Sequence, residues 1–252
     1  MNIEKIIPMI RDTERIFFDT EFKKDVAQKG AWDYVTRADQ EISRFLHEKL
    51  KEAYPDIGFV SEEEEGQAKE SCWILDPIDG TTNYMHALCP SAVSLGLRVE
   101  GKMQMGIIYI PERQEMFWGQ RGMGAYLNGN RIFCSQRMPL SECLGMMEYN
   151  AYRKDEKQKA LYCADRIFST CRDIRTIGSA AASIAYVAAG RVDAFLGRHL
   201  KLWDYAAGQV LVEEAGGKMT DEKGNIPQGE SHILATNNFV HDEFSALLKE
   251  GL

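Results

Sequence analysis

The sequence predicts an α+β protein built in layers, in which the two parts of the chain are organised differently. Up to about residue 140, amphipathic helices are followed by short strands joined by tight turns, a pattern typical of an antiparallel sheet. From about residue 141, strands alternate with helices, which predicts an α/β layer. No linker, repeat or low-complexity tract separates the parts, so we expect one domain over residues 1–252.

Apolar residues at helical spacing predict two helices near the N-terminus. The first covers roughly the first twenty residues, with Pro8 as a local irregularity. The second is marked by Ile42, Phe45, Leu46 and Leu50 and is closed by Pro55. Between them, QKGAWDYVTRAD forms a polar loop around Gly30 with a short strand-like piece.

The strands of the first part follow the second helix. IGFV and WILD are short apolar strands, and residues 91–127 then contain the strands SAVSLGLRV, MQMGIIYI, QEMFWGQ and GAYL. Turns at residues 100–102, 111–112 and 128–130 join them, which predicts an antiparallel meander.

The second part predicts four strands and four helices in alternation. The strands are CLGMMEY, DIRTIG, VDAFLG and HILATN. The helices are DEKQKALYCADRIFS, SAAASIAYVAAG, WDYAAGQVLVEEAGG and a terminal helix through FSALLKE.

Composition excludes several classes of protein. Apolar residues make up 44% of the 252 residues, which argues against disorder, and a net charge of −8 argues against binding duplex nucleic acid. The six cysteines show no metal-binding spacing, which favours free thiols in a reducing compartment. Without a signal-peptide core or a membrane-spanning run, we expect a soluble cytoplasmic protein with no membrane partner.

Two carboxylates follow the apolar strand in WILDPIDGTTNY. A turn explains Asp79-Gly80, but unpaired carboxylates at the end of a buried strand are costly, and no Lys or Arg occurs between residues 71 and 97. A Mg²⁺ ion would supply the counter-charge to Asp76 and Asp79. Gly80 and Thr81 begin the next segment, whose free backbone amides favour a phosphate. Metal ligands beside a phosphate cradle suggest phosphoryl chemistry.

Three further segments carry weaker signals. In Glu62-Glu63-Glu64-Glu65 an acidic run is usually a solvated face, but its first two members lie where a strand ends and could join the metal, leaving Glu64 and Glu65 solvated. Asp204 in WDYAAG is either a helix cap or a group that reaches a cation. The small residues from Gly178 to Ser183 reflect close packing or leave room for a ligand.

Taken together, these elements resemble the inositol monophosphatase family of Mg²⁺-dependent, lithium-sensitive sugar phosphatases. WILDPIDGTTNY matches the family pattern W-x-[IL]-D-P-[IL]-D-G-T-[TS]-N-[FY], and WDYAAGQVLVEEAGG matches its second signature. DYVTRAD and FVSEEEE match two further elements, in family order over roughly residues 28–217. The resemblance implies a five-layered α-β-α-β-α sandwich of the type shared with fructose-1,6-bisphosphatase, and a homodimer.

The resemblance also implies roles for individual residues. The ligands of two or three Mg²⁺ ions would be Glu62, Asp76, Asp79, Asp204 and the Ile78 carbonyl, with Asp76 bridging two ions. Thr81 and Asp39 would form a hydrogen-bonded pair that orients the attacking water with help from Glu62, and Glu63 would support the ligands. The Gly80 and Thr81 amides would hold the phosphate, and the sugar pocket would be lined by Gly178, Ser179 and Ala180.

The segment before Trp203 departs from the family pattern. Where inositol-specific members carry a glutamate, this chain has Gly197, followed by Arg198, His199 and Lys201. This positive charge is either a solvated basic turn or a contact for a second phosphate of the substrate, which would involve Arg198 and Lys201. Lys29 lies one residue out of register with a family lysine that contacts metal-bound water.

The function implied is hydrolysis of a small phosphomonoester by in-line attack of water, with no covalent intermediate. Inositol monophosphate is the default substrate. The alternatives are the same chemistry on fructose 1,6-bisphosphate, NADP⁺ or adenosine 3′,5′-bisphosphate, and a non-catalytic role as a binding partner in an RNA-related complex. The acidic balance argues against direct contact with nucleic acid.

Overall fold

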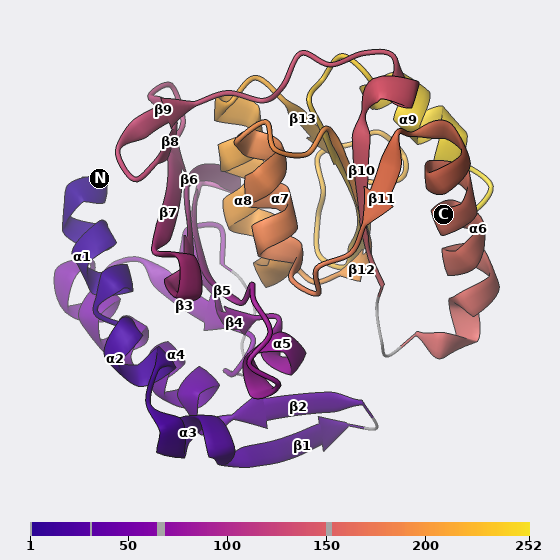
Figure 1. Cartoon of the computed structure of the whole chain (residues 1–252). Coiled ribbons are helices and arrows are strands. Elements are labelled where there is room, and N and C mark those ends of the chain that lie inside the picture. Colours follow the sequence, from indigo (N-terminus) through magenta and orange to yellow (C-terminus); the bar gives the residue numbers. More distant parts are fainter. Residues whose placement is uncertain (1, 31, 65–68, 150–152) are drawn as a thin grey trace.

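Two β-sheets and three layers of helices form a five-layered α-β-α-β-α sandwich (Figure 1). The computed structural model describes residues 2–30, 32–64, 69–149 and 153–252. The layered fold expected from the sequence is confirmed. Within the described residues, no helix is both long and apolar enough to cross a membrane. All six cysteines are free thiols.

The N-terminal segment differs from the single helix expected. It consists of the 3-10 helix Ile3–Lys5 and of the short helices α1 (Ile6–Arg11), α2 (Glu14–Phe17) and α3 (Thr20–Lys24). The buried Thr13 hydroxyl donates to the Ile10 carbonyl at 2.6 Å, and Asp19 adopts an extended backbone and caps α3. These local side-chain bonds compete with a continuous helix, so the apolar residues reach the core from separate turns.

A hairpin and a long helix follow. Strands β1 (Val26–Gly30) and β2 (Asp33–Thr36) pair antiparallel, where the sequence indicated only one short strand. Helix α4 (Arg37–Ala53) begins with a capping box, in which the Thr36 and Asp39 side chains each accept from the other's backbone amide. Its buried face includes Ile42, Leu46 and Leu50, as expected, and the helix ends two residues before Pro55.

The first sheet contains seven strands in the order β3-β4-β5-β6-β7-β8-β9. They are β3 (Gly58–Ser61), β4 (Cys72–Asp79), β5 (Ala92–Val99), β6 (Lys102–Ile110), β7 (Glu115–Gln120), β8 (Gly124–Leu127) and β9 (Asn130–Ile132). Strands β3 and β4 are parallel and every later pair is antiparallel, which confirms the expected meander. The short helix α5 (Thr81–Met85) follows β4 directly.

The second sheet has five strands in the order β11-β10-β12-β14-β13. They are β10 (Leu144–Glu148), β11 (Asp173–Arg175), β12 (Ala194–Leu200), β13 (Lys218–Thr220) and β14 (Ser231–Thr236). Helices α6 (Lys157–Thr170) and α9 (His241–Leu248) cover its outer face (Figure 1). The edge strand β13 was not expected, because three residues are too few to carry an alternating pattern.

Helices α7 (Ala180–Ala188) and α8 (Leu202–Glu214) form the layer between the sheets. Buried residues of both sheets and both helices belong to one apolar cluster, including Phe117, Ile184, Phe195 and Leu211. Close approach of α8 to β6 requires a glycine at position 106, because a Cβ atom there would lie 2.0 Å from the Ala207 carbonyl oxygen. The middle of α8 therefore lies directly against the first sheet.

Candidate active site

Carboxylates from separate elements meet at the place where β4 ends and α8 begins. Asp76 and Asp79 lie on β4, Glu62 follows β3 and Asp204 lies in the first turn of α8. A register shift in the β4–β5 pairing between Asp76 and Asp79 lets residues three apart lie at one site. All four line a pocket of about 560 Å³ that lies between the two halves of the chain.

Three of these carboxylates lie within metal-binding range of one another. One oxygen each from Asp76, Asp79 and Asp204 lies within 4.8 Å of the others. Asp76 is only 2% exposed, and its Oδ1 atom has no hydrogen-bond partner. A buried carboxylate oxygen left without a donor is costly unless a cation completes its environment.

Burial and the closeness of the carboxylates raise the pKa values of this cluster. Burial, followed by the charges of Glu62, Asp79 and Asp204, raises the pKa of Asp76 well above its usual value. Burial also raises the pKa of Asp204, and it raises that of Asp79 to about 6 even though Ser179 and Ala181 donate to the Asp79 carboxylate. The ionised carboxylates repel one another, and a bound cation would offset this repulsion.

The donor set suits Mg²⁺. Every candidate ligand atom is an oxygen of a carboxylate or of the Ile78 carbonyl, and hard divalent cations prefer such oxygens. At the rim, Lys29 Nζ pairs with Glu63 Oε1 at 2.5 Å and lies 3.7 Å from Glu62 Oε1. The unpartnered oxygen of Asp76 and this all-oxygen environment both fit a magnesium ion.

The turn after β4 brings backbone amides to the pocket. Gly80 has φ of +89°, which favours glycine, and a Cβ atom there would lie 2.9 Å from the Gly178 carbonyl oxygen. The Thr81 hydroxyl donates to the Ile78 carbonyl at 3.1 Å. Gly80 and Thr81 both line the pocket, next to the carboxylates.

Asp39 has a partner other than the one expected. Its carboxylate accepts from the Thr36 amide at 2.8 Å and from the Thr36 hydroxyl at 2.5 Å, because it is part of the α4 capping box. Within the described residues, the structure therefore does not join Asp39 to Thr81 by a hydrogen bond. Burial raises the pKa of Asp39 to about 7, and its charge is among those that raise the pKa of Asp76.

The segment before α7 completes the pocket. Gly178 and Ala180 line it, and the Ser179 hydroxyl and the Ala181 amide both donate to Asp79 Oδ2.

Sequence reasoning missed Glu148, which lies at the end of β10 and is only 7% exposed. Its position directly after the apolar Met146-Met147 is the same strand-end signal that identified Asp76.

Glu148 holds this segment in place. Its carboxylate accepts from the amides of Ile177 at 2.8 Å and Gly178 at 3.0 Å. It also accepts from the hydroxyls of Thr176 at 3.0 Å and Ser183 at 3.1 Å. Glu148 lines the pocket itself and fixes the chain that carries Ser179 to Asp79.

Comparison with known proteins agrees with this geometry. The model of the inositol monophosphatase family matches residues 2–250. The chain belongs to this family. It is similar to Nus factor SuhB of Escherichia coli (35% identity over 244 residues, 92% of this chain and 91% of the relative). It is also similar to a Thermotoga maritima protein named fructose-1,6-bisphosphatase/inositol-1-monophosphatase (36% over 222 residues, 88% and 84%).

A solved structure gives the same result. The extragenic suppressor protein suhB from Bartonella henselae superimposes with a TM-score of 0.92 at 33% identity, covering 99% of each chain. The chain is therefore an inositol monophosphatase family member over nearly its whole length, and its fold is the family sandwich.

The basic residues at the end of β12 and just after it do not all face the acidic pocket. His199 and Lys201 line the acidic pocket, but Arg198 does not. Arg198 is 2% exposed, donates to Glu156 Oε2 at 2.8 Å and bonds the Gly251 carbonyl, so the structure turns it away from the expected substrate contact. The Lys201 ammonium pairs with Glu230.

A side chain at position 197 would require Leu200 to move. A Cβ atom on Gly197 would lie 2.3 Å from Leu200 Cδ1, and Leu200 lines the pocket. An apolar side chain therefore lies near the place where inositol-specific family members carry a carboxylate.

The acidic run after β3 is less solvated than expected. Glu62 lines the pocket, and the Glu63 side chain is 6% exposed and pairs with Lys29. Glu64 accepts from the Ser43 hydroxyl at 3.2 Å and pairs with His47 at 3.1 Å, because α4 packs beside it, so the expectation of a solvated Glu64 is corrected. Glu65 lies outside the described residues.

Proposed function

We propose that this protein is a Mg²⁺-dependent phosphatase that hydrolyses a small phosphate monoester. The observation that carries the proposal is the buried group of Asp76, Asp79 and Asp204, with one Asp76 oxygen left without a partner inside a pocket of about 560 Å³. Such a cluster suits a cation, and a cation among carboxylates beside the turn at Gly80 and Thr81 suits a phosphate ester.

The ligands of two or three Mg²⁺ ions would be Glu62, Asp76, Asp79, Asp204 and the Ile78 carbonyl, with Asp76 shared between two ions. When bound, Mg²⁺ supplies positive charge that lowers the pKa of water and neutralises the phosphate. Glu63 would help to position Glu62, because both carboxylates lie close to the Lys29 ammonium.

The other residues of the pocket position the substrate and the water. The Gly80 and Thr81 amides hold the phosphate oxygens, and the Thr81 hydroxyl and Glu62 orient the attacking water. Asp39, which bonds Thr36 in this structure, would join Thr81 in that role only by changing its hydrogen-bond partner. The water oxygen forms a bond to phosphorus while the bond from phosphorus to the ester oxygen on the opposite side breaks. One proton of the water is transferred to the leaving alkoxide, and the other stays on the phosphate product. No cysteine lines the pocket among the described residues, which supports a route without a thiol nucleophile.

Inositol monophosphate is the default substrate within this proposal, with the leaving alcohol beside Gly178, Ser179 and Ala180. Fructose 1,6-bisphosphate, NADP⁺ and adenosine 3′,5′-bisphosphate are the alternatives. The name of the Thermotoga maritima relative favours testing fructose 1,6-bisphosphate, and the missing side chain at Gly197 removes one expected contact to inositol.

The finer expectations belong to the same proposal. We expect residues 1–252 to act as a single domain and to form a homodimer that is inhibited by lithium. We also expect a cytoplasmic protein, supported by six free cysteines.

A second candidate is a binding role. The relative named Nus factor SuhB favours a function as a partner in an RNA-related complex. In that case the protein would bind a macromolecular partner without releasing phosphate from any ester. The retained carboxylate cluster favours catalysis, and the net charge of −8 argues against direct contact with nucleic acid.

Phosphate release in Mg²⁺ tests the proposal. The panel is inositol 1-phosphate, fructose 1,6-bisphosphate, NADP⁺ and adenosine 3′,5′-bisphosphate, each with wild type, Asp76→Asn and the exposed control Asp56→Asn. We expect strong turnover of one ester that is lost in Asp76→Asn and kept in Asp56→Asn. Near-normal activity of Asp76→Asn would refute the metal role of Asp76. No turnover by wild type, together with capture of a macromolecular partner, would favour the binding role.

A further inference from the structure

Strand β12 becomes irregular where it reaches the acidic pocket. The register between β12 and β14 shifts between Gly197 and Leu200, and we call residues 197–200 the β12 bulge. Within it His199 has φ of +50°, in the left-handed region that few non-glycine residues adopt. Such a conformation persists where the surroundings hold it, and it is common at functional sites. The groups that hold His199 therefore bear on the pocket beside it.

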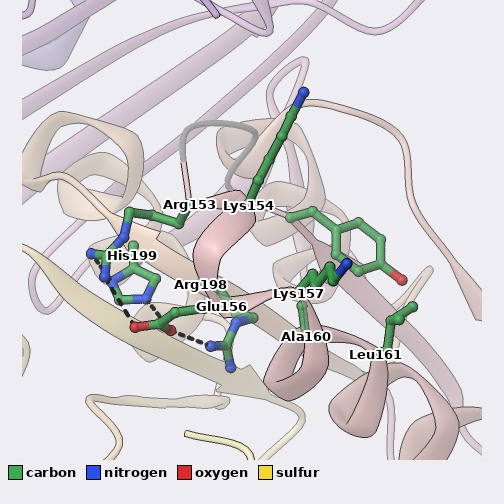
Figure 2. Close-up of a pocket in the computed structure, with 9 residues that line it drawn as sticks. Arg153, Lys154, Glu156, Lys157, Ala160, Leu161, Arg198 and His199 are labelled. Atoms are coloured by element: carbon green, nitrogen blue, oxygen red, sulfur yellow. Dashed lines mark hydrogen bonds and ion pairs between the residues drawn. The ribbon is translucent and has the colours of Figure 1, made fainter. Parts of the chain in front are cut away.

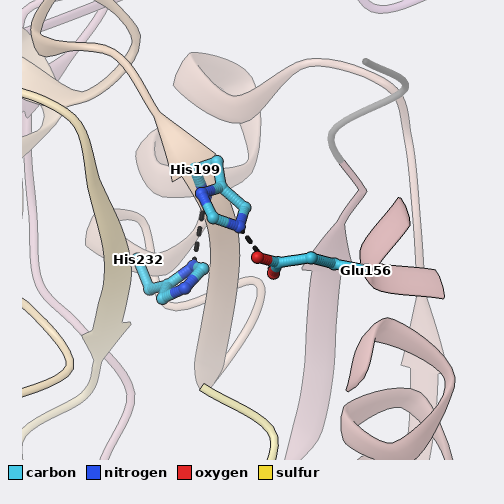
Figure 3. Close-up of side chains that lie close together, drawn as sticks. All are labelled: Glu156, His199 and His232. Atoms are coloured by element: carbon cyan, nitrogen blue, oxygen red, sulfur yellow. Dashed lines mark hydrogen bonds and ion pairs between the residues drawn. The ribbon is translucent and has the colours of Figure 1, made fainter. Parts of the chain in front are cut away.

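His232 on the neighbouring strand β14 holds the backbone of His199. The His199 amide donates to His232 Nδ1 at 3.2 Å, and the two rings lie edge to face with their centroids 4.3 Å apart (Figure 3). In a regular antiparallel pair, an amide that faces the partner strand donates to a backbone carbonyl. At the β12 bulge, an imidazole nitrogen takes the place of that carbonyl.

A carboxylate holds the ring of His199. Its Nε2 atom lies 2.8 Å from Glu156 Oε2, and Arg198 donates to the same oxygen at 2.8 Å. Figure 2 shows the Glu156 carboxylate between the His199 ring and the Arg198 guanidinium. Arg153 lies 3.3 Å from the other ring nitrogen, Nδ1. Neighbouring side chains therefore fix both the ring and the backbone of His199.

The β12 bulge directs consecutive residues toward the acidic pocket. His199, Leu200 and Lys201 all line it, whereas the side chains of a regular strand alternate between its two faces. The Lys201 amide then donates to Asp204 Oδ2 at 2.7 Å. Because Asp204 is a proposed metal ligand, the bulge connects one wall of the pocket to the group that would hold a cation.

The hydrogen bond from His199 requires one protonation state of His232. Because Nδ1 accepts from an amide, it carries a lone pair, and a neutral ring then carries its proton on Nε2. Burial, followed by the charges of His199 and Arg198, lowers the pKa of His232 to about 4, while Glu222 and Glu156 act in the opposite direction. The ring is therefore neutral at pH 7 and suited to accept the amide.

The same tautomer argues against a metal site at these histidines. Ligand atoms of Glu156, His199 and His232 lie within 4.8 Å of one another. With Nδ1 bonded to an amide and a proton on Nε2, His232 has no lone pair left for a cation. Arg198 and Arg153 already bond the two Glu156 oxygens at 2.8 and 3.0 Å. The group is therefore a hydrogen-bonded support.

We propose that His232 is a positioning residue for the leaving-group side of the active site: its Nδ1 acceptor holds the β12 bulge, and the bulge sets the positions of Leu200 and Asp204. His232 does not itself line the acidic pocket, so it acts through His199. The inference rests on the proposed function wherever turnover is measured. The state of the His232 ring can be measured without turnover.

Nuclear magnetic resonance tests the His232 ring in the metal-free protein. The sample is ¹⁵N-labelled protein in EDTA, and long-range ¹H–¹⁵N correlation spectra distinguish protonated from unprotonated ring nitrogens. At pH 7 we expect an unprotonated Nδ1 and a protonated Nε2 on His232, and a large shift of the His199 amide resonance in His232→Leu. A proton on Nδ1, or a His199 amide unchanged in His232→Leu, would overturn the proposal.

Two substitutions separate hydrogen bonding from the filling of space. The side-chain oxygen of His232→Asn can accept the His199 amide in place of Nδ1, whereas His232→Leu fills the space without an acceptor. In saturating Mg²⁺ we expect His232→Leu to raise KM for the preferred ester about tenfold, as for loss of one buried hydrogen bond, and His232→Asn to restore most of the loss.

Inorganic phosphate provides the second readout and Ser231→Ala the control. The product phosphate is held by the turn at Gly80, on another element, so its inhibition constant should stay the same in His232→Leu. Ser231→Ala removes a hydroxyl of the same strand that bonds Gln228, and should change neither constant.

The outcomes separate this role from a general structural one. Equal losses in His232→Asn and His232→Leu, or a parallel rise of KM and the phosphate inhibition constant, would overturn the positioning role. If wild type hydrolyses no ester, the proposed function fails, and the spectra alone decide whether His232 holds the β12 bulge.

Discussion

The carboxylate of Asp79 accepts a hydrogen bond from the Ser179 hydroxyl, which joins the end of β4 to the start of α7. The Ala181 amide donates to the same oxygen at 2.8 Å. These bonds aim Asp79 toward Asp76 and Asp204, so one candidate metal ligand depends on a segment a hundred residues further along the chain. Four of the predictions below test this arrangement and the pocket it builds.

Ser179→Ala should weaken Mg²⁺ activation. Without the hydroxyl, Asp79 loses one of the donors that stabilise its ionised form, and groups that orient metal ligands typically contribute about 10- to 100-fold in metal affinity. The measurement is the Mg²⁺ concentration that gives half-maximal phosphate release. Ser231→Ala, whose hydroxyl bonds Gln228 away from the pocket, is the control and should leave that concentration unchanged. The same Mg²⁺ requirement in Ser179→Ala would contradict the role assigned to Ser179.

Glu148→Gln should also raise the Mg²⁺ requirement, although Glu148 is not among the proposed metal ligands. The variant points an amide group at donors that now bond a carboxylate, so the segment that carries Ser179 shifts. Because both residues act through Asp79, we expect the double variant with Ser179→Ala to be little worse than the worse single variant. Additive effects in this double-mutant cycle would show that Glu148 acts independently of Ser179.

Thr81→Ala should lower kcat by about tenfold or more and change KM by less than about twofold. The reason is that the hydroxyl orients the attacking water, whereas the backbone amide that holds the phosphate is retained. Steady-state kinetics on the preferred ester separates the two effects. A rise in KM alone would make Thr81 a phosphate contact.

Mg²⁺ should stabilise the wild-type fold. At a concentration 100 times its dissociation constant, a ligand adds about 2.7 kcal/mol, or roughly 5–10 °C in a chain of this size. In EDTA, Asp76→Asn should melt no lower than wild type, because it replaces a carboxyl whose charged form is disfavoured by burial and then by Glu62 and Asp79, and its shift with Mg²⁺ should be smaller. Thermal melts followed by circular dichroism test this, with Asp56→Asn as the control. Equal shifts in all three proteins would count against a metal at Asp76.

Protonation of His241 at low pH should destabilise the fold. Burial, and then Lys218, lowers the pKa of His241 to about 4, and its ring nitrogens bond Thr236 at 3.0 Å and Thr220 at 3.1 Å. A lowered pKa means that the unfolded chain binds the proton more readily. The stability gained is present above the ordinary histidine pKa near 6.5 and is lost as the pH falls towards 4.

Urea unfolding at pH 7, 5.5 and 4 measures this loss. His241→Asn should be less stable at pH 7 but should lose less stability on acidification. His232, whose pKa is also lowered to about 4 by burial and by His199, should account for part of the remaining slope. An identical pH slope in wild type and His241→Asn would remove His241 from this explanation.

Much of the fold could be predicted from the sequence because its signals are local. The meander from β5 to β8 follows from alternating apolar residues and tight turns, and α4 follows from the spacing of Ile42, Leu46 and Leu50. The broken N-terminal helix could not be predicted in the same way. Its apolar spacing is helical, but the bond from Thr13 to Ile10 ends the first turns early.

The sequence by itself determined that carboxylates follow a buried strand beside a glycine turn, and hence that a cation and a phosphate suit Asp76, Asp79 and Gly80. Only the tertiary structure decided that Glu148 supports the segment before α7 and that Arg198 faces away from the pocket while His199 faces it. The physical reason is that β12 shifts register against β14 between Gly197 and Leu200, and His199 takes a positive φ there. Strand alternation therefore fails at that point, and the direction of each side chain depends on a partner strand some thirty residues further along the chain.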